Sequence, residues 1–107
     1  MGKNNESKFD IKILPSFTEE FGLILNYISN ELSNKNAAEN FLLDVINAIE
    51  SRSLYPNVFE KYVGQKRTKK EWYRIYIRNY TIFYTVEKNI MKVAHIIYSG
   101  RNYETIF

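Results

Sequence analysis

The stretch from Trp72 to Tyr103 constrains the fold most, because it alternates β-branched and aromatic residues through three short runs. Polar pairs at Arg78-Asn79 and Lys88-Asn89 separate the runs. Runs of this composition with short polar breaks predict a three-stranded antiparallel meander. A sheet is therefore the expected scaffold. The same stretch holds three of the arginines and six of the tyrosines, so it is the first place to look for chemistry.

An additional strand and a helix are predicted ahead of the meander. Residues 9–14 (FDIKIL) alternate apolar and polar side chains and end at Pro15, which predicts one strand. Ser16 and Glu19 have the spacing of a capping box, in which each side chain satisfies a free backbone N–H at a helix start. Apolar residues then recur at helical spacing, so we expect a first helix over residues 17–32.

A second apolar stripe, between residues 38 and 49, predicts another helix that ends before Pro56. The connector of residues 33–36 is short, which makes the two helices antiparallel neighbours. Neither helix can bury its stripe alone, so both should pack on one face of the sheet. The expected fold is therefore α+β, with the order β-α-α-β-β-β and a small, mostly antiparallel sheet.

The 107 residues suit one domain, expected over residues 9–107, with a disordered polar tail over residues 1–8. No apolar run approaches the roughly 20 residues that span a bilayer, so no membrane partner is expected. The N-terminal residues lack the apolar segment of a secretory signal. The chain contains no cysteine. These features favour a cytoplasmic location.

Charge is distributed unevenly along the chain. Residues 1–60 carry five cations and nine acids, a net charge of −4, whereas residues 61–107 carry ten cations and three acids, a net charge of +7. A basic half suits a nucleic-acid backbone or an acidic protein segment. The loop expected over residues 57–71 holds a dense basic run, so we expect partner binding by four of its side chains, Lys66, Arg67, Lys69 and Lys70.

Several kinds of site find no support in the sequence. One histidine and no cysteine do not make a metal site, and no glycine-rich phosphate loop or cofactor motif is present, so neither a metal nor a small-molecule cofactor is expected. His95 lies within the third run and is expected to be a packed or half-buried strand residue, with proton transfer as the alternative. Glu19 and Glu20 are expected to be acids of the first helical turn that complement the helix dipole.

The cations of the meander point to a binding surface. If the helices cover the side of the sheet that carries Tyr73 and Ile75, then Trp72, Arg74 and Tyr76 lie on the other face. Loop cations and Arg101, just past the third run, could reach that face and form a phosphate-binding floor. The alternative is a basic surface that only confers solubility. The tyrosines of the meander are expected mainly to pack in the core.

These pieces together resemble the RelE/ParE superfamily of toxins from bacterial type II toxin–antitoxin modules. The resemblance rests on LPSFTEEFGLILNYI, AAENFLLDVINAIESRSLYP, YRIYIRNYTIFYTV and IIYSGRNYETIF, in that order over residues 11–107. It implies a cognate antitoxin as partner, whose C-terminal segment wraps the toxin. It also implies an action on translation or on DNA topology.

The superfamily has two branches with different activities. RelE-like members cut mRNA on the ribosome, and the resemblance to them assigns catalytic roles to Arg74, Arg101 and Tyr103. Charge and strand position add RNA or partner binding by the four loop cations, Trp72, Tyr76 and Arg78. This chain departs from the RelE pattern at Thr81, where an arginine is usual. ParE-like members inhibit DNA gyrase without such a catalytic set. We expect a ribosome-dependent endoribonuclease acting on mRNA, with a gyrase inhibitor or a degenerate, antitoxin-binding toxin as alternatives.

Overall fold

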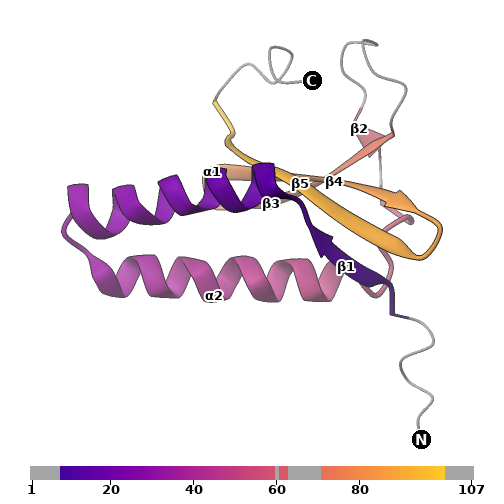
Figure 1. The fold of residues 1–107 in the computed structure, drawn as a ribbon, viewed down its shortest axis with the longest axis horizontal. Helices are drawn as coiled ribbons and strands as arrows, with labels where there is room; N and C mark the ends of the chain where they lie inside the picture. Colours follow the sequence, from indigo (N-terminus) through magenta and orange to yellow (C-terminus); the bar gives the residue numbers. More distant parts are fainter. Residues whose placement is uncertain (1–7, 60, 63–70, 101–107) are drawn as a thin grey trace, which may run out of the picture.

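The computed structural model describes residues 8–59, 61 and 62, and 71–100 of the chain. Two antiparallel helices lie on one face of a five-stranded sheet, and the loop end of the helical hairpin projects beyond the strands (Figure 1). The elements, in chain order, are β1 (Asp10–Ile13), α1 (Pro15–Asn26), η2 (Tyr27–Glu31), α2 (Lys35–Arg52), β2 (Lys61–Tyr62), β3 (Trp72–Ile77), β4 (Tyr80–Glu87) and β5 (Ile90–Tyr98). This arrangement confirms the predicted α+β fold and the order of its main elements.

The sheet is mixed, with the strand order β1-β5-β4-β3-β2. β3, β4 and β5 form the predicted antiparallel meander, and β1 adds to β5 in parallel, with Asp10 opposite Ile90. The two-residue strand β2 was not expected, because residues 57–71 show no alternating pattern. It pairs with the start of β3.

Both turns of the meander fall where the polar pairs predicted them. Arg78 and Lys88 adopt left-handed backbone conformations, with φ of 53° and 58°, that let the chain reverse within two residues. Between Phe83 and Tyr84 the register of β4 against β5 shifts by one residue, so Ala94 bulges out of the ladder. The bulge lies where the pairing of β1 with β5 ends and side chains of the N-terminal turns of α1 begin to contact the edge of β5.

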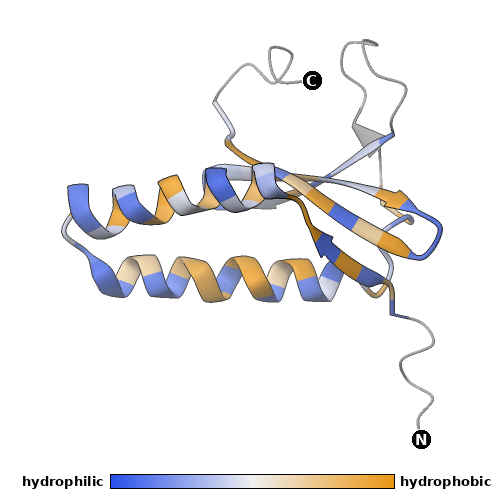
Figure 2. Cartoon of the chain, in the orientation of Figure 1, coloured by the Kyte–Doolittle hydropathy of each residue, from blue (hydrophilic) through white to orange (hydrophobic). Residues whose placement is uncertain are grey.

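The main core lies between the helices and the sheet. Phe41 and Val45 of α2 pack there against Tyr73 and Ile75 of β3, together with buried residues of α1, β4 and β5. In Figure 2, hydrophobic and hydrophilic residues alternate along β5, whereas the turn between β4 and β5 is hydrophilic. A second, smaller cluster on the opposite face contains Trp72, Phe83, Ala94 and Ile97.

The predicted capping box at the start of the first helix is wrong. Pro15 has a fixed φ and no N–H, so it suits the first helical position, and α1 therefore starts there with Leu14 as its N-cap residue. Ser16 consequently lies inside the helix, and its hydroxyl donates to the carbonyl oxygen of Ala94 at 2.6 Å. The first turn contains no acid, so Glu19 and Glu20 do not have the predicted first-turn role. The second helix is capped by Asn34, whose side chain accepts a hydrogen bond from the N–H of Ala37 at 3.0 Å.

Candidate functional site

The sheet face opposite the helices carries the predicted residues of β3. Tyr73 and Ile75 belong to the main core, so the alternation of the strand directs Trp72, Arg74 and Tyr76 to the other side, as the sequence predicted. Trp72 is nevertheless buried, only 8% exposed, and its ring lies edge-to-face against Phe83 at 6.4 Å between centroids. Its indole therefore packs in the second cluster and does not present a stacking surface.

Arg74 and Tyr76 form the more accessible part of this face. The Arg74 guanidinium carbon lies 5.2 Å from the centre of the Tyr76 ring, within the range of a cation–π contact. Tyr76 is 64% exposed, whereas Arg74 is partly buried. The pair thus offers a cation and an aromatic ring side by side.

Thr81 lies directly opposite Tyr76 on β4, and so on the same face. Its side chain is fully buried, and its hydroxyl lies 2.8 Å from that of Ser99. At this position the resemblance to RelE-like members implied an arginine, and this chain has a small, buried hydroxyl instead.

Arg78 lies apart from Arg74. Its guanidinium forms an ion pair with Asp44 of α2 and lies 5.2 Å from the ring of Phe41. Arg78 thus contacts the helix side of the molecule. The structure does not bring it together with Arg74 and Tyr76.

Six of the predicted site residues lie outside the described residues. They are Lys66, Arg67, Lys69 and Lys70 of the basic loop, together with Arg101 and Tyr103 near the C-terminus. Residues 1–7 of the predicted tail also lie outside them. Within the described ranges, no three histidine, cysteine or acidic side chains gather as a metal site requires. In the same ranges, no helix is both long and apolar enough to cross a bilayer.

His95 is a half-buried strand residue, which is the environment that the sequence favoured. Its Nδ1 lies 3.0 Å from Oε2 of Glu20, and its ring lies 6.0 Å from that of Trp72. The other carboxylate oxygen of Glu20 accepts a hydrogen bond from the backbone N–H of Ile96 at 3.0 Å. Glu20 therefore joins α1 to β5.

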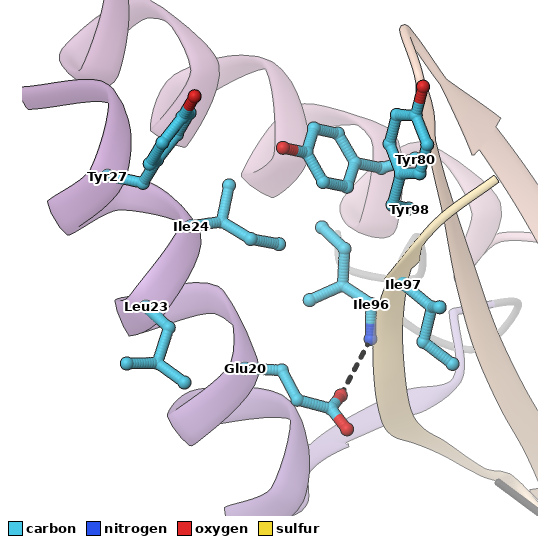
Figure 3. Close-up of a pocket in the computed structure, with 8 residues that line it drawn as sticks. All are labelled: Glu20, Leu23, Ile24, Tyr27, Tyr80, Ile96, Ile97 and Tyr98. Carbon is cyan, nitrogen blue, oxygen red and sulfur yellow. Dashed lines mark hydrogen bonds between the residues drawn. The ribbon is translucent and has the colours of Figure 1, made fainter. Parts of the chain in front are cut away.

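A groove between α1 and β5 was not predicted from the sequence. It encloses about 300 Å³, and Leu23 of α1 and Tyr27 of η2 face Ile96 and Tyr98 of β5 across it (Figure 3). The signal in the sequence was the position of Leu23 and Tyr27, two large apolar residues outside the stripe assigned to the core. Because Leu23 and Tyr27 lie outside the core stripe, their side chains remain exposed and can line the groove.

Three tyrosines, Tyr27, Tyr80 and Tyr98, line one end of this groove (Figure 3). Burial raises the pKa of Tyr80, and the neighbouring side chains of Tyr27 and Tyr98 raise it further. The Tyr80 ring packs against Phe41 and Tyr98, at 5.3 and 6.0 Å between centroids. The groove thus combines apolar walls with tyrosine side chains.

Comparison with known proteins identifies the class of protein that carries these features. In a comparison with curated proteins, nothing matched. Residues 11–103 match the family described as "ParE toxin of type II toxin-antitoxin system, parDE". The match runs from β1, through the helical hairpin and the meander, to beyond β5, and it confirms the resemblance to the RelE/ParE superfamily. The chain therefore belongs to the ParE toxin family of type II toxin–antitoxin systems.

Proposed function

We propose that this toxin stops growth by binding DNA gyrase, without cutting RNA. A toxin of this family has a cognate antitoxin as its partner. The observation that carries the proposal is Thr81. Its buried hydroxyl stands where an RNA-cleaving toxin would place a phosphate-binding arginine. Stabilising the charge that develops on a phosphate during cleavage needs cations aimed at it, and a buried threonine supplies none.

Two neighbouring observations support the same proposal. Trp72, which could have stacked on a base, is buried against Phe83. Arg78, a candidate phosphate ligand, is paired with Asp44 next to the helices. The exposed ring of Tyr76 and the cation of Arg74 remain together on the outer face, a combination common where one protein binds another.

The first test compares the two activities directly. We expect the purified toxin to block supercoiling by DNA gyrase and to leave a defined mRNA intact in a purified translation system, as primer extension would show. The control is a second topoisomerase that relaxes the same plasmid. Because the chain is basic, non-specific binding to DNA would inhibit both enzymes, whereas binding to gyrase would inhibit one.

Ribosome-dependent cleavage of mRNA is the second candidate function. The observation in its favour is that Phe83 pairs with Arg74 on one side and His95 on the other, which puts both polar groups on one face. New 5′ ends that require ribosomes and disappear in Arg74→Ala, with supercoiling unaffected, would replace the gyrase proposal with this one.

A further inference from the structure

The segment of residues 53–59 follows α2, at the end of the helix away from the hairpin loop, and it exposes four large apolar side chains (Figure 1). Leu54, Tyr55, Val58 and Phe59 are 43%, 60%, 70% and 46% exposed. Single exposed apolar residues need no explanation, whereas a run of them in one segment marks a candidate interaction surface. None of the four belongs to either buried cluster of the described residues, so packing of the core does not account for them.

The backbone of this segment is nevertheless held in place. The buried Ser53 donates its hydroxyl hydrogen to the carbonyl of Glu50 at 2.6 Å, and its own carbonyl accepts from the N–H of Phe9 at 3.0 Å. The carbonyl of Pro56, another buried residue, accepts from the hydroxyl of Tyr84 at 2.7 Å. The exposed side chains therefore project from a fixed backbone, which lowers the conformational entropy lost when a partner binds.

Arg52 connects this segment to the exposed pair on the outer face of the sheet. Its guanidinium carbon lies 3.6 Å from the centre of the Phe59 ring, and its Nη1 donates to the backbone carbonyl of Arg74 at 2.8 Å. The guanidinium of Arg74 lies 5.2 Å from the centre of the Tyr76 ring. Among the described residues, β2 pairs with β3 only before Arg74, so Arg52 occupies the strand edge where that pairing ends. The contacts thus run continuously from the segment, around the edge of β3, to Tyr76.

The chemistry of these residues suits a protein partner with acidic groups. Residues 51–59 and 72–78 contain three arginines, at positions 52, 74 and 78, and no aspartate or glutamate. Arginine and aromatic residues are enriched where protein interfaces gain most of their binding energy. An occupant with carboxylates around an apolar centre would complement this composition. A second copy of this chain would instead bring like charges together across a two-fold axis.

We propose that gyrase binds the toxin at one surface around the edge of β3, the arginine–aromatic surface, made of Arg52, Tyr55, Val58, Phe59, Arg74 and Tyr76. Apolar side chains of gyrase pack against Tyr55 and Val58, and its carboxylates pair with Arg52 and Arg74. The inference rests on the proposed function. It extends the pair of Arg74 and Tyr76 on the outer face to the segment that follows α2.

The first test uses two matched variants of the full chain. Val58→Asp and Leu43→Asp each place a carboxylate at an exposed apolar position, 70% and 57% exposed, outside the buried clusters. We expect Val58→Asp to raise about tenfold the toxin concentration that halves supercoiling by gyrase, because the new charge removes an apolar contact and repels the partner's carboxylates. Leu43→Asp, on α2, should change that concentration by less than about twofold. Equal effects of the two variants would overturn the proposal. Circular dichroism verifies the fold of both.

A second pair of variants compares this surface with the groove between α1 and β5. Tyr55 and Tyr27 are similarly exposed, at 60% and 52%, and Tyr27 lines the groove. Tyr55→Ala should weaken the inhibition of gyrase several-fold, as removal of an aromatic contact residue does, whereas Tyr27→Ala should leave it unchanged. The opposite result would assign gyrase binding to the groove and contradict the proposal.

Other occupants of the arginine–aromatic surface give different results. The purified antitoxin encoded by the reading frame next to this gene is titrated by calorimetry against the wild type and Val58→Asp. Weakened antitoxin binding by Val58→Asp, with unchanged inhibition of gyrase, would assign the surface to the antitoxin and overturn the proposal. Self-association of the wild type that Val58→Asp abolishes, measured by sedimentation, would assign the surface to a second copy if inhibition of gyrase is unchanged.

Failure of this inference can be distinguished from failure of the proposed function. A wild-type toxin that leaves gyrase active refutes the proposed function, and with it the partner named for this surface. A wild-type toxin that inhibits gyrase, together with a Val58→Asp variant that inhibits it equally well, refutes this inference alone. Growth arrest that is lost in Val58→Asp and retained in Leu43→Asp would support the inference in cells.

Discussion

At the scale of single residues, Tyr84 links three parts of the molecule. Its buried hydroxyl accepts a hydrogen bond from Nη1 of Arg52 at 2.9 Å and donates one to the carbonyl of Pro56 at 2.7 Å. Arg52 also donates to the backbone carbonyl of Arg74 at 2.8 Å and lies over the ring of Phe59 at 3.6 Å. One phenol thus joins the end of α2, the segment after it and the central strands.

Removal of the Tyr84 hydroxyl should destabilise the folded protein. We expect Tyr84→Phe to lower the free energy of unfolding by about 1–3 kcal/mol, because the buried carbonyl of Pro56 loses its donor. Urea denaturation with an unchanged m-value would measure the effect. Tyr76→Phe removes the same atom from an exposed ring and should stay within about 0.5 kcal/mol. Equal stability of the two variants would contradict the role assigned to Tyr84.

Burial was harder to predict than position at this scale. The alternation of β3 correctly placed Arg74 and Tyr76 on the face away from the helices, because side-chain direction in a strand follows from sequence parity. It could not show that Trp72 and Thr81 on that face are buried, since burial depends on segments far apart in the sequence. The ion pair of Arg78 with Asp44 was missed for the same reason.

At the scale of elements, side chains from the N-terminal half of α1 hydrogen-bond the edge of β5 where a neighbouring strand would otherwise pair. β1 covers the first part of β5, and Ser16 and Glu20 then hydrogen-bond the backbone of Ala94 and Ile96. The bulge at Ala94 lies at this transition. A helix can hydrogen-bond the backbone groups of a strand edge in this way only through polar side chains at fixed positions. Ser16 and Glu20 are therefore required for this part of the fold.

This arrangement predicts that two adjacent glutamates, Glu19 and Glu20, contribute differently to the free energy of unfolding. Glu20→Ala should lower the free energy of unfolding by about 1–3 kcal/mol, because the N–H of Ile96 and the Nδ1 of His95 lose their acceptor. Glu19→Ala, at the exposed neighbouring position, should stay within about 0.5 kcal/mol. Thermal unfolding checks both. Faster exchange of the Ile96 amide in Glu20→Ala alone would locate the effect at the sheet edge.

The elements themselves were largely predictable. The apolar stripes of both helices and both turns of the meander follow local patterns, and the structure has all of them. The predicted capping box was wrong because two helix-start signals, Pro15 and Ser16, compete at this point. Pro15 occupies the first helical position and thus places Ser16 inside the helix. β2 was missed because two residues are too few to show any period.

At the scale of the whole molecule, two tyrosines link stability to alkaline pH. Burial raises the pKa of Tyr84, although its hydrogen bond with Arg52 and the charge of Arg52 act in the opposite direction, and burial also raises the pKa of Tyr80. The folded pKa values therefore exceed the unfolded value of about 10. The folded protein retains protons that the unfolded chain loses, so this contribution is complete below about pH 10 and disappears as the pH rises further.

The melting temperature should therefore decline above about pH 10. Tyr84→Phe should show a shallower decline than the wild type, because it lacks a tyrosine whose pKa is raised in the folded protein. Tyr76→Phe is the control and should decline as the wild type does. Parallel curves for the wild type and Tyr84→Phe would exclude Tyr84 as a source of the pH dependence.

The pairing of β1 with β5 also determines when this protein can exist as a folded molecule. The partner of Asp10 is Ile90, so β1 cannot pair until β5 has left the ribosome. At about 5–20 residues per second, synthesis of the intervening chain takes on the order of ten seconds. A nascent or truncated chain without β5 leaves β1, Ser16 and Glu20 without their partners. Toxicity that requires this fold can therefore begin only after β5 has been translated.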